Sequence, residues 1–396
     1  MRILYLHYGP QSGVTGAVTG ALAAAGIDVA LANPTERFLW RLRPGSRVPN
    51  PRPAALRAFA EALRLHGRCW KDYWVQTPWA FDHLSGLAGE AIQRAGPDAV
   101  LQAGVLFSPG RSPDRPYHLY LDHTRAIAER YEPAPGLPRP LPPDPAWRAR
   151  EERVYRGATT IFSMSAFAAR SLVLDYGVDP ERVWVVGAGP NVAPVAPPSP
   201  RAVEREPAIL FVGRSFTPKG GPDLVEAFRR IRRADRRAAL WIVSQEAPDA
   251  LPEGAVFHGP LAPRALAALF ARASVFCLPT LREAFGLVFL EAMAFGLPVV
   301  ATAVEAVPEI VVQGETGLLV PPRDPAGVAE ACSALLADPA RARRLGAAGR
   351  ARVAELFGWD LAAARMLDVL RSGPRRVRDV DAGLGAAPGE AGAEAG

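Results

Sequence analysis

Short apolar runs alternate with helix-like segments along the first half of the chain, and this alternation constrains the fold more than any other feature. Residues 2–8 form the first apolar run, and a glycine-rich turn then leads into a helical stretch closed by Gly26. Strands that alternate with helices form a parallel sheet covered by helices on both faces. The predicted strands are 2–8, 27–33, 98–104, 117–123, 158–165 and 182–187, and helix-like segments include 55–66 and 166–175.

The same rhythm starts again after a proline-rich stretch, 189–207, which has no apolar period and is typical of an interdomain linker. The second set of predicted strands is 208–213, 239–244, 274–280 and 298–302, and the helices are 221–234, 263–273, 286–296, 325–338 and 360–373. We therefore predict an α/β fold with two doubly wound, Rossmann-like domains that face each other across a cleft. The expected divisions are a first domain at 1–190, a linker at 191–207, a second domain at 208–358, a helix at 359–373 that could pack back on the first domain, and a disordered tail at 374–396.

The composition indicates the cellular compartment of the protein but does not identify its ligand. The 396 residues are 49% hydrophobic, which suffices for full cores, and carry a net charge of +6 with a pI of about 9.5. That charge does not separate attraction to a nucleotide from attraction to nucleic acid or to an anionic membrane. Three cysteines without metal-binding spacing favour a reduced, intracellular setting, and the first ten residues contain too short an apolar run for a signal peptide.

Residues 282–302, REAFGLVFLEAMAFGLPVVAT, are nearly all apolar but contain two carboxylates, Glu283 and Glu291. A membrane span is excluded, because Glu291 would lie at mid-bilayer and a Gly-Leu-Pro sequence would break the helix. Gly286 instead follows a strand end and starts a helix, which places Glu283 at the carboxyl edge of the sheet, where parallel sheets bind ligands. Free N–H groups at 286–289 favour an anion there. The two carboxylates could bracket a diphosphate and accept hydrogen bonds from sugar hydroxyls.

A diphosphate between two carboxylates also needs cations, and residues 211–221, FVGRSFTPKGG, supply Arg214 and Lys219 at another strand end. Arg forms a fork on phosphate oxygens, whereas Lys acts as a point charge. The alternative interpretation is that both cations lie in a solvated loop, that Glu283 is a solvated charge at a helix start, and that Glu291 points outward. Apolar neighbours make that alternative weaker for Glu291, because a buried charge needs a partner.

These segments together resemble glycosyltransferase family 4, the group 1 glycosyl transferases, which are retaining enzymes of the GT-B fold. The similarity runs through 211–221 and 278–325, where the Glu-x7-Glu pair of the family matches Glu283 and Glu291, and extends over roughly 158–372. It is weaker in 1–157, where the first glycine-rich loop reads SGVTGAV instead of two adjacent glycines and an acidic residue.

The resemblance implies a role for each matching position. Glu283 would hold the donor sugar, Glu291 the ribose, and Arg214 with Lys219 the diphosphate. The backbone N–H groups of the loop would assist, and the loop residues are Ala284, Phe285, Gly286 and Leu287. Gly13 would let the first domain approach the phosphates closely. His123 ends a predicted strand, as a family histidine near the donor sugar does, although a histidine there can also be structural.

The expected reaction is transfer of a sugar from a nucleotide-diphosphate sugar to an unidentified acceptor, which could be a glycan, a lipid-linked molecule or a small molecule. We expect no cofactor and no metal, because Arg214 and Lys219 could neutralise the diphosphate and the one Asp-x-Asp lies in the tail, at 379–381. The alternatives are a nucleotide-sugar epimerase of the same fold and a non-catalytic sugar-nucleotide-binding protein. The chain contains neither a dinucleotide-binding nor a P-loop motif.

The acceptor side is the least determined part of the sequence. The aromatic run 69–83 could stack on sugar rings or pack as core, and the proline-rich segment 131–147 could be an acceptor loop or a surface connection. We expect no nucleic-acid partner and a cytoplasmic protein. Weak peripheral contact with a membrane surface through the basic residues of 37–47 stays open.

Overall fold

The computed structural model of the protein describes residues 1–9, 11–37, 41–42, 49–50, 53–67, 74–110, 115–131, 144–194 and 207–372. Residues 195–206 of the predicted linker and the whole predicted tail, 374–396, lie outside the described residues. The same holds for most of 37–47 and for parts of 69–83 and 131–147.

Six parallel strands form the sheet of the first domain, in the order β2-β1-β5-β6-β7-β8. They are β1 (Arg2–Leu6), β2 (Asp28–Ala32), β5 (Ala99–Ala103), β6 (Tyr117–Leu121), β7 (Thr160–Ser163) and β8 (Val183–Val185). The domain also contains the antiparallel pair β3 (Arg41–Leu42) and β4 (Pro49–Asn50), the short helices η1 (Gln11–Gly13), η2 (Pro34–Arg37) and η4 (Pro180–Arg182), and the helices α1 (Val14–Ala24), α2 (Pro53–His66), α4 (Pro78–Ala95), α5 (Arg125–Glu129), α6 (Pro145–Gly157) and α7 (Ala166–Tyr176). All five residues of β5 are buried, as expected for a central strand covered on both faces.

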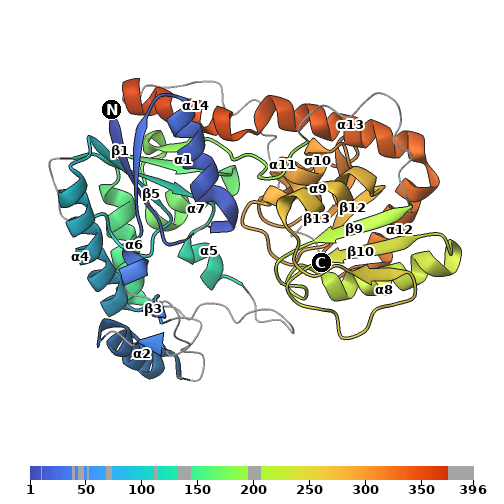
Figure 1. The fold of residues 1–396 in the computed structure, drawn as a ribbon, viewed down its shortest axis with the longest axis horizontal. Coiled ribbons are helices and arrows are strands. Elements are labelled where there is room, and N and C mark those ends of the chain that lie inside the picture. Colours follow the sequence, from blue (N-terminus) through green and yellow to red (C-terminus); the bar gives the residue numbers. More distant parts are fainter. Residues whose placement is uncertain are drawn as a thin grey trace, which may run out of the picture.

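The second domain repeats this plan with the order β11-β10-β9-β12-β13-β14, again all parallel. Its strands are β9 (Ala208–Val212), β10 (Ala239–Val243), β11 (Ala255–Phe257), β12 (Val275–Leu278), β13 (Val299–Thr302) and β14 (Gly317–Val320). Its helices are α8 (Gly221–Ala234), α9 (Pro263–Arg272), α10 (Leu287–Ala294), α11 (Val307–Ile310), α12 (Pro325–Ala337) and α13 (Pro339–Leu356), and α14 (Trp359–Ser372) follows. Figure 1 shows the two domains beside each other, the first in blue to green and the second in yellow to orange.

Both sheets reverse their strand order next to their first strand. β1 lies between β2 and β5, and β9 lies between β10 and β12, so the chain moves to one side and then to the other. The crevice outside the carboxyl ends of the strands at such a switch point is where open parallel sheets bind ligands. The predicted α/β fold with two Rossmann-like domains is confirmed, and the loops after β1, β9 and β12 contain most of the predicted site residues.

The last helix returns from the second domain to the first. α13 lies on the second domain, whereas α14 packs against α1, and Figure 1 shows the two helices along one side of both domains. Nη1 of Arg365 on α14 donates to the carbonyl oxygen of Val186 at 2.9 Å. A Cβ at Gly189 would lie 2.4 Å from the backbone nitrogen of Trp359, so the two chain segments that pass between the domains pack backbone against backbone. Buried residues of α14 join the two domains into one continuous apolar core.

A carboxylate of the second domain caps a helix of the first. Glu309 on α11 accepts hydrogen bonds from the backbone N–H groups of Ala166 and Phe167, each at 2.7 Å, at the start of α7. The side chain of Ser165 takes the next free N–H group, that of Ala168. Glu309 is buried, and burial raises its pKa while the two N–H groups lower it. The first turn of α7 is therefore satisfied only while the two domains stay in contact.

We predict that Glu309→Ala lowers the free energy of unfolding by about 1–3 kcal/mol, because it leaves two N–H groups at the domain contact without an acceptor. Thermal and urea unfolding, followed by circular dichroism, would measure the loss. Glu330→Ala is the matched control, since Glu330 is exposed on α12. Equal stability of the two variants would show that the cap contributes nothing.

Candidate active site

Charged side chains from both domains gather where three strands end. The loop after β9 carries Arg214 and Lys219, the loop after β12 carries Glu283, and β6 leads directly into Asp122 and His123. Asp122 interacts electrostatically with Glu283, which raises its pKa, and with Lys219, which lowers it, although burial is the larger cause of the raised pKa. The carboxyl edges of the two sheets therefore face one shared cluster of charges.

Lys219 and Glu283 form the centre of this cluster. Nζ of Lys219 lies 2.7 Å from Oε2 of Glu283, and it also donates to the carbonyl oxygen of Arg282 at 3.4 Å. Only 25% of the Lys219 side chain and 12% of the Glu283 side chain are exposed. The structure thus brings together two predicted residues that lie 64 positions apart, and Glu283 is not a solvated charge at a helix start.

Arg214 belongs to the same loop as Lys219 and has an exposed side chain. Its carbonyl oxygen accepts hydrogen bonds from the backbone of Gln245 and from the hydroxyl of Ser244, both at 3.1 Å. The loop that carries the guanidinium group is therefore anchored to the end of β10. An anchored loop with an exposed cation can hold an anion without first being ordered.

Glu305 supports the loop that contains Glu283. Its Oε2 accepts a hydrogen bond from the backbone N–H of Glu283 at 2.6 Å. Burial raises the pKa of Glu305, and a hydrogen bond from the Tyr131 hydroxyl lowers it. The backbone of Glu305 has a φ of 49°, a left-handed conformation that non-glycine residues adopt at a cost. The chain thus keeps a strained residue at the position that fixes the Glu283 backbone.

Glu291 is buried inside α10, with only 7% of the residue exposed. Its Oε1 accepts a hydrogen bond from the backbone N–H of Asn191 at 3.3 Å. Burial raises the pKa of Glu291 to about 7, and the N–H groups of Asn191 and Val192 lower it in part. The carboxylate therefore points toward the segment between the domains and not outward, and it has no cation of its own in the described contacts.

Gly13 and the loop that follows β1 reach the same place from the first domain. Gly13 is the N-cap of α1 and has a φ of 92°. A Cβ at this position would lie 2.8 Å from Nδ2 of Asn191, so a larger residue would displace the Asn191 amide. Gly13 and Glu291, which the sequence predicts on opposite sides of the cleft, therefore both contact Asn191.

His123 belongs to an aromatic and charged group that crosses the cleft. Its Nε2 and the hydroxyl of Tyr131 are hydrogen-bonded at 2.8 Å, and the guanidinium carbon of Arg282 lies 3.5 Å from the centre of the Tyr131 ring. Burial, and secondarily the charge of Arg282, lowers the pKa of His123 to about 4. The imidazole is therefore neutral at pH 7 and can exchange hydrogen bonds without carrying a charge.

Helix starts at the cleft differ from most other helix starts. Side chains cap the first turn of α4, α5, α6, α7, α12 and α13, through Thr77, Thr124, Asp144, Ser165, Asp324 and Asp338. By contrast, α1, α8 and α10 begin at the left-handed residues Gly13, Gly220 and Gly286, and none of the three has a side-chain cap. Each of these helices follows a loop that carries a predicted site residue. Their first N–H groups can therefore bind an anionic ligand.

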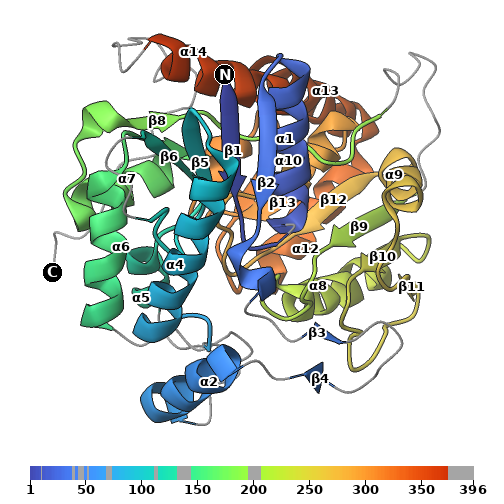
Figure 2. The same cartoon turned by 60° about the vertical axis from the view of Figure 1, so that its left-hand side comes forward.

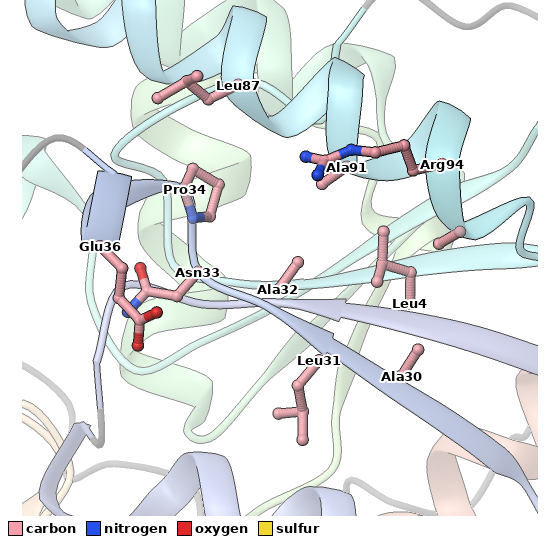
Figure 3. Close-up of a pocket in the computed structure, with 11 residues that line it drawn as sticks. Leu4, Ala30, Leu31, Ala32, Asn33, Pro34, Glu36, Leu87, Ala91 and Arg94 are labelled. Carbon is pink, nitrogen blue, oxygen red and sulfur yellow. The ribbon is translucent and has the colours of Figure 1, made fainter.

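A cavity of about 740 Å³ lies elsewhere, between β2 and α4 in the first domain. Figure 3 shows Leu87 and Arg94 of α4 on one side of it, and Ala32, Asn33 and Glu36 at and beyond the end of β2 on the other. Its walls combine apolar side chains with Asn33, Glu36 and Arg94, and none of the predicted site residues lines it. The charged cluster at the cleft, and not this cavity, is the candidate active site, because chemistry needs the converging polar groups.

Among the described residues, no helix has the length and apolarity needed to cross a bilayer. No group of three or more His, Cys, Asp or Glu side chains in this part of the chain is placed to hold a metal ion. Cys277 and Cys332 are buried with free thiols, and burial, with a contribution from Cys332, raises the pKa of Cys277.

Comparison with protein families decides the assignment of the second domain. The family described as Glycosyl transferases group 1 matches residues 206–338. Residues 206–338 are therefore similar to the group 1 glycosyl transferases. A D-inositol 3-phosphate glycosyltransferase of Xylanimonas cellulosilytica is 35% identical over 280 residues, which cover 64% of this chain and 66% of that protein. The chain spans less than two thirds of the length of the first curated relatives that it matches. The family resemblance predicted from the two motifs is confirmed.

Solved structures match the whole two-domain fold. A sucrose-phosphate synthase from Thermosynechococcus elongatus has a TM-score of 0.68 at 23% identity, over 94% of this chain and 98% of that one. The Anabaena protein HepE, solved in complex with UDP and glucose, has a TM-score of 0.65 at 16% identity, over 93% of this chain and 99% of that one. At these identities the similarity supports the GT-B fold alone.

Sequence reasoning missed several residues of the candidate site. Asp122, Tyr131, Arg282 and Glu305 surround the predicted charges, and Asn191 joins Gly13 to Glu291. A sequence signal existed for two of them, because Asp122 lies at the carboxyl end of the predicted strand 117–123 and Arg282 adjoins the Glu-x7-Glu motif. The signal for Tyr131, Asn191 and Glu305 was weak, since each gains its role only from contacts with distant segments.

The raised pKa of Glu291 predicts a pH-dependent cost to stability. Between the ordinary pKa of a glutamate and about 7, the folded state holds a proton on Glu291 that the unfolded state releases, so stability falls as pH rises through this window. A glutamine at this position does not titrate. As pH rises from 4.5 to 8, we therefore expect the free energy of unfolding of Glu291→Gln to gain on the order of 3 kcal/mol relative to wild type. Urea unfolding across this range would measure the difference.

Glu330→Gln is the control, because it removes one exposed carboxyl group and keeps the buried carboxyl group of Glu291. Parallel stability curves for wild type and Glu291→Gln would contradict the prediction.

Proposed function

We propose that the protein is a glycosyltransferase that moves a sugar from a nucleotide-diphosphate sugar to an acceptor with retention of anomeric configuration. The observation that carries the proposal is the partly buried pair of Lys219 and Glu283, 2.7 Å apart, at the switch point of the second domain. The neighbouring helices α8 and α10 begin without side-chain caps. One cleft thus offers a cation and free N–H groups for a diphosphate, together with a carboxylate for sugar hydroxyls.

In the proposed complex the diphosphate lies at the start of α10, where the backbone N–H groups of the loop 284–287 and the cations Lys219 and Arg214 balance its charge. Lys219 then exchanges its partner Glu283 for a phosphate oxygen, which frees the Glu283 carboxylate to accept hydrogen bonds from the sugar. Glu291 accepts hydrogen bonds from the ribose. The absence of a Cβ at Gly13 lets the loop of the first domain approach the phosphates.

The proposed reaction breaks the bond between the anomeric carbon and the phosphate oxygen, and the diphosphate leaves with the electron pair. The acceptor hydroxyl forms its new bond on the same face of the sugar, and its proton passes to an oxygen of the departing phosphate. Negative charge grows on the diphosphate in the transition state, where Lys219, Arg214 and the helix N-terminus stabilise it most. His123 is neutral at pH 7 because its pKa is about 4, so it contributes hydrogen bonds and not charge.

The acceptor is expected on the side of the first domain, near His123 and Tyr131. Several relatives are named for D-inositol 3-phosphate, which makes a small hydroxylated phosphate one acceptor to test. We place the reaction inside the cell, because the thiols of Cys277 and Cys332 are free. If the acceptor is lipid-linked, the protein would also contact a membrane surface.

A panel of UDP-, GDP-, ADP- and dTDP-sugars tests the proposal. We expect at least one to raise the melting temperature of the protein, because a ligand that binds only the folded state stabilises it. The stabilising donor is then incubated with and without candidate acceptors, and the products are separated. A new glycoside supports the proposal, an isomerised donor without acceptor would indicate an epimerase, and binding without any product would indicate a sugar-nucleotide-binding protein.

We predict that Lys219→Ala lowers kcat by about 10²–10³-fold, because the ammonium stabilises charge that develops on the leaving diphosphate. Lys219→Arg should recover only part of this loss, because a planar guanidinium does not replace a compact point charge. Steady-state kinetics with varied donor would measure the effect, and Arg264→Ala, an exposed cation on α9, is the control. A higher KM with unchanged kcat would remove the catalytic role of Lys219.

We also predict that transfer activity survives an excess of EDTA, because Lys219, Arg214 and the uncapped helix starts supply the positive charge that the diphosphate needs. The measurement compares initial rates before and after chelation and dialysis. A loss of activity that Mg²⁺ or Mn²⁺ restores would show that these groups do not suffice.

A further inference from the structure

Asn191 lies where the two domains and the segment between them meet. Its side-chain Nδ2 donates to the carbonyl oxygen of Ser12 at 2.7 Å, and its backbone N–H donates to Oε1 of Glu291 at 3.3 Å. One residue at the start of the predicted linker therefore hydrogen-bonds to the glycine-rich loop of the first domain and to the second carboxylate of the Glu-x7-Glu pair. Figure 2, turned from Figure 1, shows α1, which starts in this loop, beside α14, the helix that returns from the second domain.

The loop that Asn191 contacts is strained. Three consecutive residues have left-handed backbones, with φ of 46° at Gln11, 55° at Ser12 and 92° at Gly13. Two of the three are not glycine, and such residues keep this conformation only where surrounding contacts hold it. Inside the loop, Oγ1 of Thr15 donates to the carbonyl oxygen of Gly9 at 2.8 Å. The hydrogen bond from Asn191 to the Ser12 carbonyl oxygen joins this turn to a segment outside the first loop.

The position of this turn matters because α1 starts within it. Gly13 is the N-cap of α1 and provides no side-chain acceptor, so the first N–H groups of the helix are available at the cleft. A shift of the turn moves those groups. The Cβ position of Gly13 lies 2.8 Å from Nδ2 of Asn191, so the turn and the amide are packed against each other as well as hydrogen-bonded.

We propose that Asn191 is a positioning residue, which holds the Ser12–Gly13 turn in its left-handed form and couples it to Glu291. The inference rests on the proposed function, since it assigns to Asn191 the task of keeping the donor-binding segments of the two domains in register. When the ribose of a donor engages the carboxylate of Glu291, the hydrogen bond from the Asn191 backbone changes with it. The Ser12–Gly13 turn, which the Asn191 side chain contacts, then changes position. By thermodynamic linkage, a change in the turn alters the affinity of Glu291 for the ribose to the same extent.

The chemistry of the contact requires an amide. The carbonyl oxygen of Ser12 needs a donor, which the Nδ2 group supplies and a carboxylate of the same shape does not. Asn191→Asp keeps the volume but places two acceptors against each other and adds a negative charge near Glu291. Asn191→Ala removes the contact and also clears the space beside Gly13. The two variants separate the hydrogen bond from the packing.

The first measurement uses the ligand-free full-length protein and needs no donor. Hydrogen exchange of the backbone amides at 11–15 should be faster in Asn191→Ala and in Asn191→Asp than in wild type, while exchange in β5 stays unchanged. Asn33→Ala is the matched control, because the Asn33 side chain accepts hydrogen bonds from the backbone and hydroxyl of its near neighbour Thr35, at a turn after β2. Unchanged exchange at 11–15 in both Asn191 variants would overturn the proposed tie.

The second measurement is a double-mutant cycle on binding of UDP, GDP, ADP and dTDP, each followed by calorimetry. We expect Gly13→Ala and Asn191→Ala each to weaken the nucleotide that binds wild type by about 10- to 100-fold. The double variant should be no weaker than the weaker single variant, because the alanine at 191 relieves the contact with the new Cβ at 13. In steady-state kinetics, Asn191→Ala should raise KM for the donor more than it lowers kcat. Partial unfolding would instead lower the apparent kcat and leave KM unchanged, because only the concentration of active protein falls.

The outcomes separate the two proposals. Wild type that binds none of the four nucleotides contradicts the proposed function, and the coupling fails with it. Wild type that binds one of them, with Asn191→Ala equal to Asn33→Ala, supports the function and overturns the role of Asn191. Additive losses in the cycle would also overturn the coupling, because they would show that Asn191 and Gly13 act independently.

Discussion

The first turn of α7 depends on a carboxylate from the other domain, and this contact constrains everything in the cleft. Two N–H groups at 166 and 167 donate to Glu309 at 2.7 Å each, in a buried position where water does not replace the acceptor. Because these bonds are short and directional, they fix where the carboxyl edge of one sheet lies relative to the other. The return of α14 to α1 adds apolar burial to the same arrangement. The loops that carry the site residues are held face to face as a consequence.

Within that frame, the site keeps groups that lower stability. Glu291 is buried without a cation, and burial raises its pKa to about 7, while Glu305 keeps a left-handed backbone at a φ of 49°. Interior carboxylates and strained residues persist where function requires them. In the proposed function, the hydroxyl groups of a nucleotide sugar would donate hydrogen bonds to Glu291, and its phosphates would pair with Lys219. Binding would therefore offset part of the cost of burying Glu291.

The rarity of lysine in this chain supports a specific role for Lys219. Lysine occurs at only two positions, 71 and 219, although Lys and Arg together number 46. A chain that uses arginine almost everywhere has retained a lysine where a compact ammonium lies 2.7 Å from Glu283. A guanidinium is larger and planar, and it would not fit the same contact in the same way. Of the arginines of the site, Arg214 has an exposed side chain and Arg282 lies against an aromatic ring.

The sequence by itself determined the local chemistry of this protein. Apolar periodicity predicted the two parallel sheets, and the spacing around Glu283 and Glu291 predicted a helix start with carboxylates at a sheet edge, because these patterns depend on neighbours along the chain. It did not determine that Asn191 would join Gly13 to Glu291, or that Tyr131 would meet a residue of the other domain. Those contacts join segments that lie 100 or more positions apart in the chain, and their partners follow from how the two domains dock. Docking depends on the complementary shapes of two folded surfaces, which no short stretch of sequence specifies, so only the tertiary structure decided which residues share the cleft.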